Sequence, residues 1–388
     1  MGDPAVDRAE RLAAAVIEDG AQLDALAPAW GRLAEDAGSP VGAPTGVRAW
    51  WRHLAPRGAR LAVVAVHDAD ELVGLAPFYA SRRLGVTVLR LISADLASRV
   101  DILARPGREL EVAGALAGGL AAELRPDVLR WEGVDASTRW PQRLSHAWPG
   151  GRAHRLSHEL ARPGPVLELA AHSSYEEWLA AKSRHFRRRL RQGRRALERD
   201  GASFRLADRA SLDRDLGSFG RLHSARWQGR GGSLAVNAET MAMLREVGEE
   251  LIESGRFRLW MLDGPGGEPV SAELLLAARG EVASWNGGFD ADWGKYSPGI
   301  ATLAVAIEDA YERGDRRLDL GGGAAEYKDR LADGDSPVAW QTSFPRGARY
   351  PLARLWRLPE QTARRFSGSA KSLLGPVAYN RIRRTLRV

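Results

Sequence analysis

The stretch that decides the fold is GGFDADWGKYSPGIATLAVAIEDAYERGDRRLDLGGGAAEYKDRL, residues 287–331. A strand is predicted to end near Phe289. After a loop, Ser297 and Pro298 are typical of the N-cap and first turn of a helix, which Gly314 closes. The buried stripe of this helix is expected to consist of Ile300, Leu303, Ile307 and Tyr311.

The start of this predicted helix is a candidate phosphate site. Gly299 has no side chain to keep a ligand away from the free backbone N–H groups of the first turn, and the helix dipole also favours an anion there. The same Pro and Gly also suit a helix start that binds nothing. A phosphate site and a purely structural helix start therefore both remain open.

A second candidate site follows the helix. The run LDLGGGAAEYKDRL places Asp319 at a strand end, three glycines in a turn, and Glu326, Tyr327 and Lys328 at the start of a short helix. Open α/β sheets place their chemistry at strand ends that lead into such turns. These groups can supply a base, an acid and a cation, but an ordinary surface helix start has the same composition.

The rest of the chain indicates two halves with a common plan. Helices, a strand pair, a further strand, a helix and a strand precede residues 148–165, which are rich in Gly and Pro and indicate a junction. A similar order follows, and its last strand, SPVAWQTSF, completes the second half. The predicted boundaries are 1–150 for the first domain, 151–200 for the junction and a basic helix, 201–347 for the second domain and 348–388 for a tail.

The composition excludes several classes of protein. The chain has 388 residues, is 44% hydrophobic and contains no Cys, so disulfides, thiolate nucleophiles and Cys-based metal sites are excluded. The eight His are scattered, and we expect no metal site. No stretch is long and apolar enough for a membrane span, and the acidic start is unlike a signal peptide, so we expect a cytoplasmic protein.

Two basic segments dominate the charge. Residues 182–209 hold eleven Lys or Arg against three acids, and residues 346–388 hold eleven against one. The first segment is predicted to be a helix that Ser174 and Glu177 begin as a capping box, with an apolar stripe of Leu179, Phe186, Leu190 and Leu197. It is either a solvated connecting helix or a surface for phosphate, nucleic acid or membrane. The tail is expected to be solvated or to contact the surface of a membrane.

In their order and spacing, four runs together resemble the GNAT-type acyltransferases, and more narrowly the CelD/BcsL group named for cellulose biosynthesis. They are K-S-R-x-x-R-R-x-L-R at 182–191, GFD at 288–290, SPG at 297–299 and D-L-G-G-G...Y-K at 319–328. The resemblance implies an α/β fold of two GNAT-like domains similar to the Fem-type transferases. Each domain then has a central, mixed and mostly antiparallel sheet flanked by helices, and the first domain is degenerate.

The resemblance also implies an acyl-CoA donor, acetyl-CoA in particular, held in the second domain by backbone N–H groups of a strand and a helix start. Lys295 stands where many simple GNATs have an Arg/Gln-rich signature, in a loop that is short and not basic. The donor-binding positions that the match indicates are Trp285, Asn286, Gly287, Gly288, Lys295, Tyr296, Ser297, Pro298, Gly299, Ile300 and Ala301.

Catalytic roles follow from the same match. Tyr327 is expected to protonate the departing CoA thiolate, and Glu326 or Asp319 to deprotonate the attacking amine, with Glu273 as a rival base. Lys328, one of only four Lys, is expected to contact an oxygen of the substrate or intermediate. Residues expected to bind the acceptor substrate are Lys182, Arg184 and Asp290.

The expected function is acyl transfer from CoA to the amine of a small molecule or amino-sugar. One alternative is Fem-like transfer of an aminoacyl group from tRNA, which the basic helix favours and whose binding would weaken steeply with salt. The other is a non-catalytic scaffold in polysaccharide or envelope assembly, which replacement of Tyr327 and Lys328 would not impair.

Overall fold

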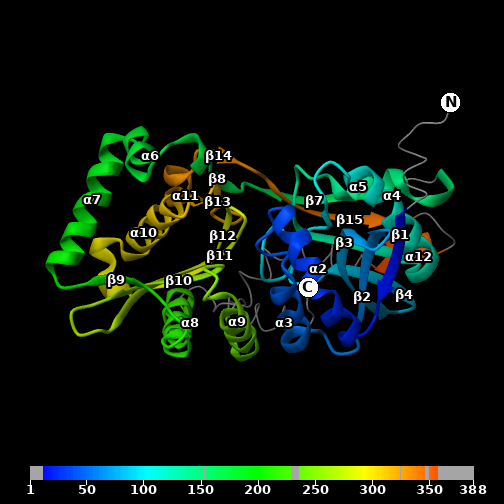
Figure 1. Ribbon diagram of the computed structural model, residues 1–388, viewed down its shortest axis with the longest axis horizontal. Helices are drawn as coiled ribbons and strands as arrows, with labels where there is room; N and C mark the ends of the chain where they lie inside the picture. Colours follow the sequence, from blue (N-terminus) through cyan, green and yellow to red (C-terminus); the bar gives the residue numbers. More distant parts are fainter. Residues whose placement is uncertain (1–11, 152–153, 229–235, 324, 346–348, 357–388) are drawn as a thin grey trace.

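Two β-sheets lie side by side, each with helices packed against it (Figure 1). The structure is a computed structural model, and it describes residues 12–151, 154–228, 236–323, 325–345 and 349–356. The predicted tail falls mostly on residues 357–388, outside the described residues. No helix in the described ranges is long and apolar enough to cross a membrane.

The first sheet has the strand order β1-β2-β3-β4-β6-β15-β7, and β5 pairs with β3. All pairs are antiparallel except β4 and β6, which run parallel. The strands are β1 (Leu12–Ile17), β2 (Arg60–Asp68), β3 (Glu71–Arg83), β4 (Val86–Leu91), β5 (Leu103–Ala104), β6 (Val128–Asp135), β7 (Arg155–Arg162) and β15 (Val338–Phe344).

Helices cover both faces of this sheet. In β2, Val63 and Ala65 join the core under α2 and α3, whereas Val64 and Val66 join the core under α4 and α5. Because successive side chains point to opposite faces and both faces are buried, the strand is apolar from Leu61 to Val66. The helices are α2 (Gly20–Asp36), α3 (Pro44–Leu54), α4 (Glu109–Gly119), the π-helical turn η1 (Leu120–Leu124), α5 (Trp140–Ala147), the 3-10 turn η2 (Pro149–Gly151) and α12 (Tyr350–Trp356).

The second sheet has the order β14-β8-β13-β12-β11-β10-β9. Only β12 and β13 run parallel, and the other pairs are antiparallel. The strands are β8 (Pro165–Leu167), β9 (Ser203–Leu206), β10 (Phe257–Asp263), β11 (Pro269–Ala278), β12 (Glu281–Phe289), β13 (Arg317–Asp319) and β14 (Gly334–Asp335).

Helices α8 and α9 pack on one face of the second sheet, and α10 packs on the other, with α6 and α7 against α10 (Figure 1). The helices are η3 (Leu169–Ala171), α6 (Tyr175–Ala181), α7 (Arg184–Arg199), α8 (Leu212–Gln228), α9 (Ala238–Leu251), η4 (Ala291–Tyr296), α10 (Pro298–Glu312) and α11 (Glu326–Leu331). Of these, η3 and η4 are 3-10 helices.

The two sheets follow one plan. In the first sheet, four antiparallel strands, β1 to β4, are followed by the parallel strand β6 and then by the antiparallel strand β15. In the second sheet, the same order is β9 to β12, then the parallel strand β13, then the antiparallel strand β8. The fold is therefore two GNAT-like domains, each with a mixed and mostly antiparallel sheet flanked by helices. This confirms the predicted fold class.

Two chain segments cross between the domains, and one of them corrects the sequence prediction. The last strand was expected to complete the second half, but β15 lies in the first sheet, between β6 and β7 (Figure 1). In the opposite direction, β8 leaves the predicted junction and joins the second sheet. Strand β7 also falls in that junction; it is mostly exposed at a sheet edge, which explains its polar sequence.

The predicted basic helix is also corrected, because it is two helices. Ser174 caps α6, as expected, by accepting a hydrogen bond from the Glu177 N–H (3.2 Å). That helix ends before Lys182, whose backbone is extended, and Ser183 caps α7 anew by accepting from the Phe186 N–H (3.3 Å). The expected apolar residues are nonetheless buried, Leu179 at the end of α6 and the others along α7.

The domains share a core where α3 packs on α9. Polar contacts accompany this interface: the Thr45 hydroxyl donates to Glu250, and the Glu246 carboxylate pairs with Arg52 and accepts from the His53 ring (2.9 Å). Such a continuous core fixes the first domain against the second one, so loops of both domains can line the same cavities.

Candidate active site

A gap opens in the second sheet between β12 and β13. The two strands pair only from Glu281 to Ala283, opposite Arg317 to Asp319. Beyond that point β12 continues to Phe289 beside β11 alone, with a register shift that bulges the strand at Trp285. The edge of β12 that faces the gap therefore presents backbone groups that no described strand uses, which is how a sheet accepts an extended ligand.

A cavity of about 470 Å³, the gap cavity, lies at this opening. It is lined by β12, Glu273 of β11, the glycine turn 321–323, the start of α11 and one residue of α8, Arg226. The first domain also contributes to the lining, with Val41 and residues 96–98. The predicted site residues that it brings together are Glu273, Trp285, Asn286, Gly287, Asp319, Tyr327 and Lys328. Glu326 is not among its lining residues; it is exposed and forms an ion pair with Arg330.

Glu273 is the buried acid of the gap cavity, with 8% of its surface exposed. Its Oε1 accepts a hydrogen bond from the Ser284 hydroxyl (2.6 Å). Its other oxygen lies over Gly287, where a Cβ would come within 2.0 Å of it, so any larger residue there would displace this carboxylate. Burial raises the pKa of Glu273 to about 7, while the Ser284 bond and the charges of Arg226 and Lys328 oppose the rise. A carboxyl group with this pKa can accept a proton near neutral pH.

Tyr327 and Lys328 face Glu273 from the start of α11. Burial, and next the charge of Glu273, raise the pKa of the Tyr327 hydroxyl, so it holds its proton at neutral pH. The Lys328 ammonium donates to the Gly321 carbonyl (3.0 Å), and burial lowers its pKa. The cavity thus combines a proton acceptor, a proton donor and a cation.

Arg226 and His223, both on α8, were missed by the sequence analysis. The Arg226 guanidinium donates to the Gly287 carbonyl (3.4 Å) and lies 5.4 Å from the ring centroid of Phe289. A ring nitrogen of His223 lies 3.2 Å from the same carbonyl, and burial lowers the pKa of this imidazole. One arginine among 56 basic residues gives no sequence signal, so only the packing of α8 on β12 could identify it.

Asp319, a predicted base, is held by a residue of the first domain. Its carboxylate pairs with the Arg99 guanidinium and accepts from the Gly321 N–H (3.0 Å). Arg99 also pairs with Asp135 and donates to the Ser336 carbonyl (2.6 Å), where the two crossing segments meet. Asp319 therefore has a structural role at the crossing as well as a place in the gap cavity.

Removing Arg99 is expected to destabilise the protein strongly. Arg99→Met leaves the buried Asp319 and the mostly buried Asp135 without their cation, and we expect a loss of about 3–5 kcal/mol in the free energy of unfolding. The measurement is urea unfolding at equilibrium. Arg105→Met is the matched control, because its partner Glu71 is half-exposed and the loss should stay below about 1 kcal/mol. Equal losses in the two variants would contradict this role of Arg99.

A second cavity, the helix-start cavity, has a volume of about 510 Å³ and lies where α7 faces the start of α10. Of the predicted donor-binding residues it is lined by Lys295, Tyr296, Ser297, Ile300 and Ala301. Three arginines also line it, Arg189 and Arg199 from α7 and Arg330 from α11. In the first turn of α10 the N–H groups of Ile300 and Ala301 both donate to the Ser297 carbonyl (3.1 Å), and Pro298 has no N–H. With Lys295, these arginines bring four cations to the cavity, and a phosphate is a suitable anion for them.

One detail of this helix start differs from the expectation. Ser297 occupies the N-cap position, but its side chain makes no capping hydrogen bond, and its backbone is left-handed (φ 54°). A non-glycine residue in this region is strained, and such strain often accompanies a functional site.

The remaining predicted residues lie outside the lining of both cavities. Lys182 donates to the Ala332 carbonyl (3.1 Å) and pairs with Asp333, which ties α6 to the end of α11. Asp290 caps η4 by accepting from the Asp292 N–H (3.0 Å). Residues without a lining position are Arg184, which is exposed, Gly288 on β12, and Pro298 and Gly299 in the first turn of α10.

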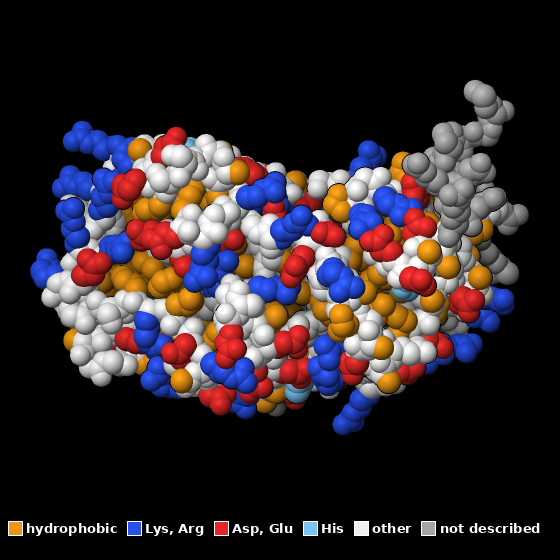
Figure 2. Space-filling view, viewed as in Figure 1, with side chains coloured by type: hydrophobic (Ala, Val, Ile, Leu, Met, Phe, Trp, Pro, Cys, Tyr) orange, Lys and Arg blue, Asp and Glu red, His pale blue; other side chains and the backbone are white. Residues whose placement is uncertain are grey.

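The basic face of α7 continues beyond the helix-start cavity. Figure 2 shows Lys and Arg side chains gathered at the edge of the molecule where α7 lies in Figure 1. The exposed arginines of this helix are Arg184, Arg188, Arg189, Arg191, Arg195 and Arg199. The sequence prediction of an amphipathic helix with a basic outer face is confirmed.

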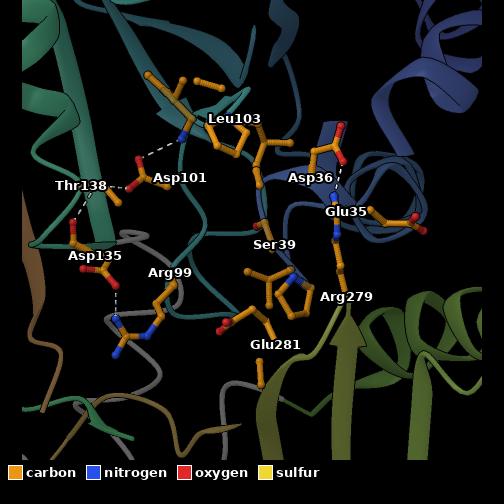
Figure 3. A pocket seen from close by; sticks show the side chains of 18 of the residues that line it. Glu35, Asp36, Ser39, Arg99, Asp101, Leu103, Asp135, Thr138, Arg279 and Glu281 are labelled. Carbon is orange, nitrogen blue, oxygen red and sulfur yellow. Dashed lines mark hydrogen bonds and ion pairs between the residues drawn. The ribbon is translucent and has the colours of Figure 1, made fainter. Parts of the chain in front are cut away.

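A third and larger cavity of about 940 Å³, the interdomain cavity, lies between the domains. Figure 3 shows Asp101, Thr138 and Asp135 of the first domain on one side and Glu281 and Arg279 of the second on the other. The Asp101 carboxylate accepts from the Thr138 hydroxyl (2.6 Å), and burial raises its pKa to about 7. The lining residues that this cavity shares with the gap cavity are Val41, Ser98, Ala283 and Asp319, so the two adjoin.

Within the described residues, no group of three or more His, Asp or Glu is placed to hold a metal ion.

Comparison with known proteins agrees with this geometry. Residues 184–329 match the family model of the acetyltransferase (GNAT) domain. No curated protein matches the chain in sequence. The matched segment includes the gap, the glycine turn, the helix start and all of α7.

Solved structures share the fold over most of the chain. A crystal structure of FemX is 12% identical, with a TM-score of 0.58, covering 88% of this chain and 99% of that one. The C-terminal domain of a putative lysylphosphatidylglycerol synthetase from Agrobacterium fabrum is 12% identical, with a TM-score of 0.54, covering 86% and 96%. A conserved protein of unknown function from Bacteroides thetaiotaomicron is 10% identical, with a TM-score of 0.51, covering 85% and 99%.

Residues 184–329 thus match a GNAT acetyltransferase domain, and the protein is an N-acyltransferase enzyme.

Proposed function

We propose that this enzyme transfers an acyl group, acetyl in the simplest case, from a CoA thioester to the amine of a small molecule or amino-sugar. The observation that carries the proposal is the gap between β12 and β13, with Glu273, Tyr327 and Lys328 in one cavity beside it. We also propose that it belongs to the CelD/BcsL group and acts in the cytoplasm; the runs at 182–191, 288–290, 297–299 and 319–328 support the group.

The residues present suit a CoA thioester. The unused edge of β12 suits the extended, amide-containing arm, and the bare turn 321–323 leaves room beside it. The helix-start cavity suits the phosphates, because four cations line it and two of them, Arg189 and Lys295, have no ion-pair partner among the described residues. When bound, the thioester supplies an activated acyl carbon.

Glu273 is the proposed general base. The attacking amine must lose a proton as its nitrogen bonds to the acyl carbon, and the Glu273 carboxylate accepts it. Its pKa of about 7 matches this task near neutral pH. Backbone donors at the β12 bulge are proposed to stabilise the negative charge that develops on the thioester oxygen.

Tyr327 is the proposed general acid. As the carbon–sulfur bond breaks, its hydroxyl donates a proton to the thiolate and is then reprotonated from water. Lys328 and Arg226 lie in the same cavity and are proposed to offset negative charge there. Asp319 and Glu326 are less suited as bases, since Arg99 holds the first and the second is exposed.

The acceptor is proposed to enter through the interdomain cavity, which adjoins the gap cavity at Ser98 and Asp319. Asp101 lines it as a buried carboxylate with no ion-pair partner among the described residues, so an amine-bearing acceptor suits this cavity.

Thermal unfolding with and without CoA and acetyl-CoA tests the donor. A ligand at 100 times its dissociation constant adds about 2.7 kcal/mol to the free energy of unfolding, so we expect a clear rise in Tm with both. An unchanged Tm at millimolar CoA and acetyl-CoA would contradict the proposal.

A second function, Fem-like transfer of an aminoacyl group from tRNA, has one observation in its favour. The exposed arginines of α7 form a basic face next to the helix-start cavity, and a polyanion suits such a face. Binding of aminoacyl-tRNA at low salt, weakening steeply as salt rises, would favour this function. No binding of tRNA at low salt would remove it.

A further inference from the structure

A fourth cavity lies under Trp285, on the α8 and α9 side of β12. Its volume is about 40 Å³, and we call it the apolar cavity. The first domain contributes Val41, Leu96 and Ala97 to its wall, and α9 contributes Met243 and Leu244. Its lining is apolar apart from Ser93, so a polar ligand would lose its hydrogen bonds to water without replacement.

The apolar cavity adjoins the gap cavity. Val41, Leu96, Ala97 and Trp285 line both. Trp285 lies at the bulge of β12, the point where the strand leaves β13, and directly precedes Asn286 in the gap cavity. An apolar group attached to a molecule held along the gap can therefore reach this cavity without crossing a polar layer.

The size of the cavity limits what fits. A cavity of about 10–15 Å³ in this measure holds one water-sized group, so 40 Å³ holds about three. That is the size of a short hydrocarbon chain. The nucleotide of CoA and a charged acceptor are both too large and too polar for it.

We propose that the apolar cavity is the acyl-chain site, and that it selects donors with acyl groups of two to four carbons. This inference rests on the proposed function, because it needs a CoA thioester in the gap. It also gives the first domain a part in specificity, since that domain supplies Val41, Leu96 and Ala97 to the wall.

Isothermal titration of the full chain with CoA, acetyl-, propionyl-, butyryl- and octanoyl-CoA tests the inference. Each added methylene up to butyryl should tighten binding about fourfold, because burial of a CH₂ contributes about 0.8 kcal/mol. Octanoyl-CoA should bind more weakly than butyryl-CoA by a factor of about ten or more, since the extra carbons have no room.

Two variants test the wall of the cavity in opposite directions. Ala43→Leu fills the cavity from a position that does not line the gap cavity, so butyryl-CoA should bind no more tightly than acetyl-CoA, with free CoA unchanged. Leu276→Ala enlarges it, so the optimum should move to longer chains. Ala238→Leu, at an exposed position of α9, is the control and should leave the whole series unchanged.

The outcomes separate this inference from the proposed function. Tight binding of free CoA with affinities independent of chain length would overturn the acyl-chain site alone. Absence of binding by CoA and by every thioester would overturn the proposed function, and the inference with it.

Discussion

Replacing Glu273 with glutamine is expected to lower kcat by about 10²–10⁴-fold, the usual contribution of a general base. The amide keeps the size of the carboxyl group and can still accept from the Ser284 hydroxyl, but it cannot take a proton from the amine. The measurement is release of CoA thiol, with the amine that the wild-type enzyme acylates fastest from a panel of primary amines. A variant with wild-type kcat would contradict the assignment.

The pH profile distinguishes a lost base from a damaged fold. Because only the carboxylate accepts a proton, wild-type kcat/KM should fall as the pH falls below about 7, and Glu273→Gln should lose this limb. Ser284→Ala removes a hydrogen bond that lowers the pKa of Glu273, so its limb should move to higher pH. If the fall of kcat/KM at low pH is identical in all three proteins, a group other than Glu273 causes it.

Stability should not explain the loss of activity. The pKa of Glu273 is higher in the folded than in the unfolded chain, so its stabilising contribution is present at low pH and is lost as the pH rises through about 7. Above that pH the native state holds a costly buried carboxylate. Glu273→Gln is therefore expected to be at least as stable as the wild type at pH 8, which urea unfolding checks.

Filling the helix-start cavity should weaken binding of CoA strongly. Ala196, a half-buried residue of α7, lines this cavity opposite the first turn of α10. In Ala196→Trp the indole would occupy the space proposed for the phosphates, and we expect the Kd for CoA to rise about 100-fold or more, equivalent to about 2.7 kcal/mol.

The matched control for this variant is Arg195→Trp. Arg195 is exposed on the same helix and does not line the cavity, so the Kd for CoA should change by no more than a few-fold. Both Kd values come from isothermal titration, and circular dichroism checks that α7 remains helical. Unchanged binding by Ala196→Trp would remove the helix-start cavity from the donor site.

Local sequence signals predicted the elements that carry the gap. The Pro298 start, the apolar spacing and Gly314 predicted α10 closely, because each is a short-range signal for a helix terminus or face. The run from Asp319 to Lys328 likewise predicted a strand, a glycine turn and a short helix. Residues within these elements, including Tyr327 and Lys328, were therefore found from sequence.

Features that depend on long-range packing could not be predicted in this way. Strand β15 has an ordinary strand sequence, and nothing local to it indicates that its partners are β6 and β7 of the other domain. Arg99 and Arg226 reach the site from a loop and a helix that are far from it in sequence. Lys182 was predicted to bind the acceptor because it begins the basic run 182–191. In the structure its backbone is extended and its ammonium pairs with Asp333, just after the end of α11.

Hydrogen exchange of the full chain, measured by mass spectrometry with and without saturating acetyl-CoA, tests the central claim most directly. If the donor lies along β12 and at the start of α10, exchange should slow in peptides covering residues 284–301 and in the facing part of α7, residues 186–199. Exchange in the helices and strands of the first domain should change little. Unchanged exchange in both segments, or slowing confined to the first domain, would contradict the account.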